Sequence, residues 1–95
     1  MIIMLSKLEQ EIELIIRHTT ILKLVIEQGP IGIMKLSELS GHPQHKVRYS
    51  LRILEQQNLI KPSSQGAIAT LKAKKFMRML PEKIKQLSEK LKKEI

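Results

Sequence analysis

The sequence lacks residue types on which whole classes of function depend. Its 95 residues contain no cysteine and no aspartate. Without cysteine, neither a disulfide framework nor a thiolate metal site can form, and we expect a cytoplasmic protein. The nine glutamates are therefore the only acidic side chains, and they are spread along predicted helix surfaces, most of them near lysine or arginine. We predict that the protein is not an enzyme and that it holds no metal and no cofactor.

The three histidines do not change this prediction. His42 and His45 are three residues apart, but the first lies in a predicted turn and the second at a predicted helix start. No acid or thiol stands near them in sequence to complete a metal site, so His42 is better explained as a side chain tucked under the turn. His18 has no obvious partner, and no strand-turn-helix segment presents a nucleophile.

Aromatic residues and long apolar runs are scarce as well. Tyr49 and Phe76 are the only aromatic residues, whereas 42 % of the chain is hydrophobic and mostly Ile, Leu and Met. This composition favours helix-on-helix packing over a β-sandwich. No apolar run approaches the ~18 residues needed to span a bilayer, and the opening residues, MIIML, lack the basic region of a signal peptide. We predict a single domain over residues 1–95 with no membrane partner.

The net charge of +8 is distributed unevenly along the chain. Residues 1–32 carry three basic and four acidic groups, residues 33–69 carry five and two, and residues 70–95 carry nine and three. Such asymmetry suggests a polyanionic partner. The alternative for the last segment is a lysine-rich helix whose charges are simply solvated.

Two long terminal segments show apolar seams at helical spacing. A helix over 6–28 is predicted to begin with Ser6 and Glu9 as a capping box, with Thr19-Thr20 as a candidate break and Gly29-Pro30 as its stop. A helix over 71–94 is predicted to follow Thr70 as its cap, with Pro81 kinking or dividing it. We predict that the seams form a homodimer interface of Leu5, Leu8, Ile12, Ile15, Met77, Leu80, Ile84, Leu87 and Leu91. In the alternative, the last helix folds back on the first within one chain.

Between these segments lies the stretch around which the chain is organised. A short helix over 34–40, a tight turn at Gly41-His42-Pro43 and a longer helix over 43–57 are predicted. The longer helix has one apolar stripe, formed by Val47, Leu51 and Leu54, and an opposite stripe that is largely basic, formed by His45, Arg48, Tyr49 and Arg52.

A β-hairpin is predicted directly after this helix. Residues 59–61 and 67–69 form its two arms, and the turn between them, Pro62 to Gly66, is rich in Pro, Ser and Gly. The link Ile31-Gly32-Ile33 is short and extended, and in a winged fold such a link often supplies a third, minimal strand. The predicted fold class is therefore mainly α with a small β-hairpin.

The central stretch resembles the winged helix-turn-helix of prokaryotic transcriptional regulators. The residues that carry the resemblance are Leu36-Ser37-Glu38-Leu39-Ser40-Gly41-His42-Pro43, Val47, Leu51, Leu54-Glu55 and Leu59-Ile60. The whole chain, including Gly29-Pro30-Ile31-Gly32-Ile33, is similar to small archaeal proteins described as predicted transcriptional regulators. The resemblance implies a winged helix-turn-helix with long terminal helices, its helix-turn-helix at 33–58 and its wing at 59–69. Ser40 and His42 depart from the apolar residues of the pattern, which predicts a looser turn, and the wing carries only one basic residue, Lys61.

In this fold the helix over 43–57 would enter the DNA major groove by its N-terminal half. Arginine pairs with guanine and glutamine with adenine, which makes base-reading candidates of Gln44, His45, Arg48, Tyr49 and Arg52. Charge or a hydroxyl makes phosphate candidates of Lys35, Ser37, Lys46, Lys61, Ser63 and Ser64. Tyr49 could instead close the edge of the core, and Arg52 could pair with Glu55 or Gln56.

The predicted function is sequence-specific binding of double-stranded DNA by a homodimeric transcriptional regulator. A two-fold axis would set the two reading helices about 34 Å apart, one turn of DNA. We expect no sensor domain within these 95 residues, and nothing in the sequence points to a small-molecule effector. The alternatives are a winged-helix module that binds another protein, and a non-specific nucleoid or RNA-binding protein.

Overall fold

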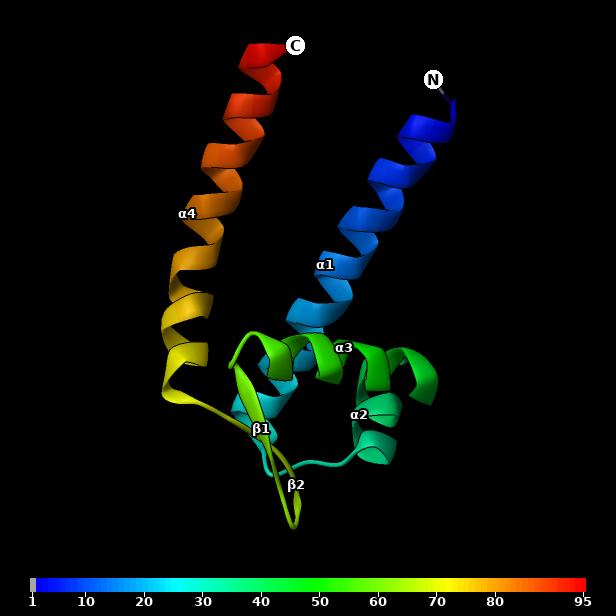
Figure 1. Cartoon of the computed structure of the whole chain (residues 1–95), viewed down its shortest axis with the longest axis vertical. Helices are drawn as coiled ribbons and strands as arrows, with labels where there is room; N and C mark the ends of the chain where they lie inside the picture. Colours follow the sequence, from blue (N-terminus) through cyan, green and yellow to red (C-terminus); the bar gives the residue numbers. More distant parts are fainter. Residues whose placement is uncertain (1) are drawn as a thin grey trace.

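The computed structural model describes residues 2–95, which form four helices and one two-stranded antiparallel hairpin (Figure 1). The mainly helical fold class with a small hairpin is thereby confirmed. In chain order the elements are α1 (Ile2–Gln28), α2 (Ile33–Ser40), α3 (Gln44–Gln56), β1 (Ile60–Ser63), β2 (Gly66–Ala69) and α4 (Leu71–Glu94). None of these helices is both long enough and apolar enough to cross a membrane.

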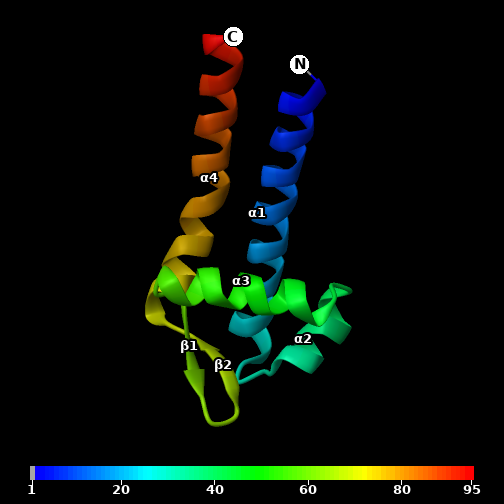
Figure 2. The same ribbon diagram turned by 45° about the vertical axis from the view of Figure 1, so that its right-hand side comes forward.

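The elements form a body from which two helical arms project. The body contains α2, α3, the hairpin and the C-terminal part of α1, while the N-terminal part of α1 and most of α4 extend from it in the same direction (Figures 1 and 2). The arms stand apart along most of their length in both views. They account for the elongated shape, 47 × 28 × 20 Å.

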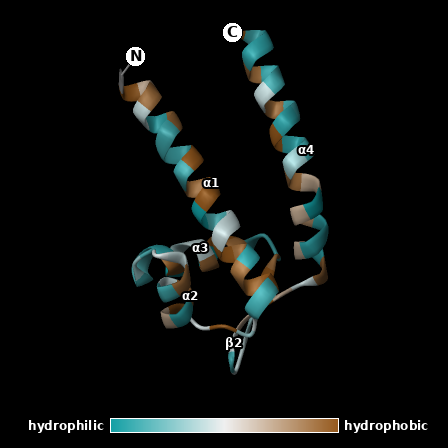
Figure 3. Cartoon of the chain, turned by 180° about the vertical axis from the view of Figure 1, so that it is seen from behind, coloured by the Kyte–Doolittle hydropathy of each residue, from teal (hydrophilic) through white to brown (hydrophobic). Residues whose placement is uncertain are grey.

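The hydrophobic core lies entirely within the body. Its buried residues come from all four helices, from β1 and from the segments beside the strands, and they are Ile21, Leu22, Val25, Ile31, Leu36, Val47, Leu54, Leu59, Ile60 and Ala73. The C-terminal part of α1 supplies Ile21, Leu22 and Val25 to this core, and Figure 3 shows that hydrophobic residues gather in this part of the helix. Burial of these aliphatic side chains is the main stabilising force of the fold.

Helix α1 differs from its prediction at its start and in its middle. It begins at Ile2 rather than Ser6, so Ser6 lies inside the helix and the predicted capping box is wrong. The predicted break at Thr19-Thr20 is also wrong, since α1 is continuous to Gln28. The Thr19 hydroxyl donates to the carbonyl of Ile15 at 2.7 Å, which keeps the side chain satisfied within the helix.

The hairpin has longer strands and a tighter loop than predicted. The strands pair from Ile60 with Ala69 to Ser63 with Gly66, which leaves two loop residues instead of five. On its other side Ala67 exchanges two hydrogen bonds with Ile31, of 3.1 and 2.8 Å, so the predicted minimal third strand is confirmed. Pro62 opposes Ala67, and because the Ala67 N–H and C=O point to Ile31, no ladder bond requires the missing proline N–H.

Thr70 does not act as the sequence suggests, and of the two alternatives for Pro81 the structure rules out division of the helix. Thr70 does precede α4, but it makes no side-chain cap, and its hydroxyl instead donates to the Asn58 carbonyl at 2.7 Å. The threonine thus ties the start of α4 back to the end of α3. Helix α4 continues through Pro81 as a single helix, so the proline does not divide it.

Candidate nucleic-acid interface

The turn between α2 and α3 is held by a set of short hydrogen bonds. Gly41 adopts the left-handed conformation (φ 76°, ψ 5°) that glycine accommodates without strain, and its N–H donates to the Ser37 carbonyl at 3.0 Å. The Ser37 hydroxyl donates to the His42 carbonyl at 2.6 Å, and the His42 N–H donates to the Ser40 hydroxyl at 3.2 Å. The expectation of a looser turn is wrong, because the polar residues close it, and His42 is half-buried as predicted.

Helix α3 presents a buried face and an exposed face, and both have a clear chemical character. Val47, Ser50 and Leu54 are buried against the body. The side chains of His45, Arg48 and Arg52 are exposed on the opposite face, together with Gln44 and Lys46 in the first turn. Glu55 is the first acidic residue of the helix, in its last turn. The first two and a half turns therefore expose only neutral or basic side chains.

A polar contact anchors α3 to α1 at the centre of the buried face. Ser50 is fully buried, and its hydroxyl accepts a hydrogen bond from Arg17 Nε at 3.0 Å and lies 2.8 Å from His18 Nδ1. The Arg17 guanidinium also lies 5.9 Å from the centre of the Tyr49 ring, and the His18 and Tyr49 ring centres are 5.9 Å apart. Tyr49, which is 44 % exposed, thus lies at the border between the exposed face and α1.

This anchor suits a neutral His18. The Ser50 oxygen accepts the Arg17 proton, and the Ser50 hydroxyl can donate its own proton to an unprotonated Nδ1 of His18. Burial, with the neighbouring positive charge of Arg17 as a second cause, lowers the pKa of His18 below its usual value of 6.5. The position of α3 on α1 is therefore coupled to the protonation of one histidine.

We predict that the free energy of unfolding decreases as the pH falls through the ordinary histidine range. Because the His18 pKa is lowered in the folded state, the unfolded state binds the proton more readily, and stability present above about pH 6.5 is lost as the pH falls below it. Urea unfolding at pH values between 7.5 and 5.5 measures the effect. The slope should disappear in His18→Ala and persist in His45→Ala, which removes an exposed histidine; a slope unchanged in His18→Ala would contradict the assignment.

The phosphate candidates lie around α3 but differ in what their side chains already bind. Lys35, Lys46 and Lys61 are exposed on α2, α3 and β1. The Ser37 hydroxyl donates its proton to the His42 carbonyl in the turn between α2 and α3. The hydroxyl of Ser63 donates to the Gly66 carbonyl at 2.6 Å, so two of the three candidate serines already donate within the chain. Ser64 is exposed in the hairpin loop.

The predicted dimer residues are mostly uncovered. Leu5, Leu8, Ile12 and Ile15 of α1 are each about half exposed or more, as are Ile84, Leu87 and Leu91 of α4. Met77 and Leu80, nearer the body, are half-buried. The alternative in which α4 folds back and covers the α1 seam within one chain is not what the structure shows.

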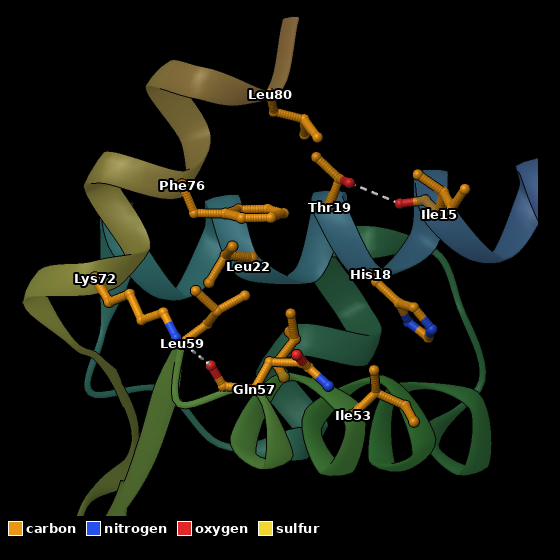
Figure 4. A pocket seen from close by; sticks show the side chains of 11 residues that line it. Ile15, His18, Thr19, Leu22, Ile53, Gln57, Leu59, Lys72, Phe76 and Leu80 are labelled. Atoms are coloured by element: carbon orange, nitrogen blue, oxygen red, sulfur yellow. Dashed lines mark hydrogen bonds between the residues drawn. The ribbon is translucent and has the colours of Figure 1, made fainter. Parts of the chain in front are cut away.

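An apolar cavity of about 230 Å³ lies where the two arms leave the body (Figure 4). Ile15 and Leu22 of α1, Ile53 of α3 and Phe76 and Leu80 of α4 are among its walls. At one end, Lys72 Nζ donates to the Gln57 carbonyl at 3.5 Å. Within residues 2–95, no three potential metal ligands gather at this or any other position.

The anchoring role of Arg17 and Ser50 is the main feature that sequence reasoning missed. The signal was the position of Ser50, three residues after Val47 and four before Leu54, which puts a hydroxyl on the buried stripe. A buried hydroxyl requires a hydrogen-bond partner, and Arg17 and His18 are among the few polar residues within the apolar part of α1. The sequence could have indicated that a partner existed, although it could not identify it.

Comparison with models of known protein families gives no match, and comparison with curated protein sequences gives none either. The functional argument therefore rests on the chain's own residues and on their arrangement.

Proposed function

We propose that the protein is a winged helix-turn-helix transcriptional regulator that binds specific sites on double-stranded DNA as a homodimer. The order of α2, a glycine turn, α3 and a hairpin is that of this fold, and the Ile31–Ala67 bridge supplies its small third strand. In this reading α3 is the recognition helix and β1–β2 the wing. This order of elements supports the proposal but is not sufficient for it, because a fold does not determine function.

The main observation in support of the proposal is the composition of the exposed face of α3. Arg48 and Arg52 are one helical turn apart, both are exposed, and His45 precedes them on the same face. Arginine is the side chain best suited to bidentate contact with guanine. The buried stripe and the Ser50 anchor hold this face rigidly, and a rigid reader loses less conformational freedom on binding.

Selection of bound duplexes from a random pool tests this function. We expect the full chain to enrich one sequence, and a homodimer should enrich a palindrome whose half-sites are one helical turn apart. The same experiment at two salt concentrations separates base contacts from charge attraction. Recovery of no preferred sequence would contradict the proposal, and failure to bind any duplex at low salt would favour a protein-binding module.

A second function is favoured by the charge of α4. Lysines at eight positions of α4 are exposed, namely Lys72, Lys74, Lys75, Lys83, Lys85, Lys90, Lys92 and Lys93. If they supply most of the affinity, the protein is a non-specific nucleic-acid binder. Affinity would then fall steeply with salt for every sequence, and Lys92→Ala with Lys93→Ala would weaken all duplexes alike.

A further inference from the structure

The two arms carry apolar seams that one chain leaves unpaired. In α1 the seam residues Leu5, Leu8, Ile12 and Ile15 recur in steps of three and four, and in α4 the same steps join Ile84, Leu87 and Leu91. All of these side chains are exposed. Steps of three and four are the spacing at which helices interlock side by side, so each seam is suited to a second helix.

The cavity shows that the seams continue into the body. Ile15 of α1 and Leu80 of α4 line it from opposite arms (Figure 4). Both residues also belong to the seams, so each seam runs from this cavity to exposed apolar side chains farther along its arm.

The charges beside the two seams are of opposite sign. Glu9 and Glu11 flank the α1 seam, and Lys83 and Lys90 flank the α4 seam; all four are exposed. Charged residues at these flanking positions determine which helices pair, because like charges repel and opposite charges attract across the seam. An α1 seam therefore prefers an α4 seam over a second α1, and the reverse holds for α4.

This preference discriminates between the two simple ways of joining two copies. If the two-fold axis runs across the arms, α1 faces the partner's α1 and α4 faces the partner's α4, which brings like charges together. If the axis runs along the arms, α1 of each copy faces α4 of the other. Only the second arrangement pairs Glu9 and Glu11 with Lys83 and Lys90 of the partner copy.

We propose that a second copy of this chain covers both seams, with α1 of each copy packed against α4 of the other around an axis parallel to the arms. The proposal rests on the homodimer of the proposed function and is independent of DNA contact. Both bodies then lie at one end of a four-helix bundle, and both α3 helices are held at that end, as a two-fold reader of adjacent half-sites requires.

Charge exchange between the seams tests this pairing in the full chain without DNA. The Glu9→Lys, Glu11→Lys variant and the Lys83→Glu, Lys90→Glu variant should each weaken self-association roughly tenfold or more, because both symmetric contacts become repulsive. The variant that carries all four changes should regain self-association. Light scattering over a concentration series gives the mass, with circular dichroism to verify the helices.

The controls separate this pairing from other ways of covering the seams. Glu27→Lys with Glu38→Lys makes the same change in net charge as Glu9→Lys with Glu11→Lys, but at exposed positions away from the seams, and it should leave self-association unchanged. Equal self-association of both two-site variants and the wild type would indicate pairing of like helices and overturn the proposal. A particle of 11.0 kDa at all concentrations would also overturn the proposal. That result would leave DNA binding by α3 to be decided separately, by the selection of bound duplexes.

Discussion

A chain that carries Arg48→Ala and Arg52→Ala is expected to lose its preference for a selected duplex over random duplex. Each arginine that pairs with a guanine contributes about 1–3 kcal/mol of discrimination, so the double variant should reduce the preference by roughly 30-fold or more. Both side chains are exposed, and their removal should leave the fold intact. Competition between the selected and a scrambled duplex at one fixed salt concentration measures the effect.

The matched control removes two positive charges from elsewhere. Lys7 and Lys23 are exposed on α1, so Lys7→Ala with Lys23→Ala changes the net charge equally without altering α3. This variant should keep its preference and lose little affinity. A preference that survives in the arginine variant would exclude α3 as the reading helix, and equal losses in both variants would mean that charge alone attracts the DNA.

Sequence periodicity predicted the parts of the fold that depend on burial of apolar stripes. Val47 and Leu54 recur at helical spacing because they must face a core, and α3 was accordingly predicted to within one residue at each end. Gly41 marked the turn since a left-handed residue is needed there. The single pairing of Ile31 with Ala67 was expected because an extended link at this place often supplies a third, minimal strand in a winged fold.

The features that sequence reasoning missed depend on contacts between distant residues. Ser50 was not recognised as an anchor because its partner Arg17 lies 33 residues away. Thr70 was predicted to cap the helix that follows it, but its hydroxyl donates to the carbonyl of Asn58, 12 residues earlier. Side-chain hydrogen bonds of this kind can be predicted only when the tertiary structure is known, because the helix propensity of a residue reflects only its neighbours within the same turn. Exposure of the arms also depends on the tertiary structure. The seams therefore predicted that these helices pair, but they did not identify the helix with which each one pairs.

Gly66→Ala is expected to be among the most destabilising single substitutions in the chain. Gly66 has a φ of 128°, which L-residues rarely adopt, and an added Cβ would lie 2.5 Å from the Ile31 carbonyl carbon. The backbone strain and the collision each cost about 1–3 kcal/mol. A domain of this size has roughly 5–14 kcal/mol of stability in total, so urea unfolding should show a large loss.

Two other glycines separate the strain from the collision. Gly41 has a φ of 76° but open space around the new Cβ, and Gly41→Ala should cost only the left-handed conformation, about 1–2 kcal/mol. Gly32 has open space and an ordinary φ of −94°, so Gly32→Ala should change the stability by less than about 1 kcal/mol. The expected order of destabilisation is Gly66, then Gly41, then Gly32. If Gly66→Ala cost no more than Gly41→Ala, the close approach of the hairpin to Ile31 would be wrong. The attachment by which this contact holds the hairpin to the body, beside α3, would then be wrong as well.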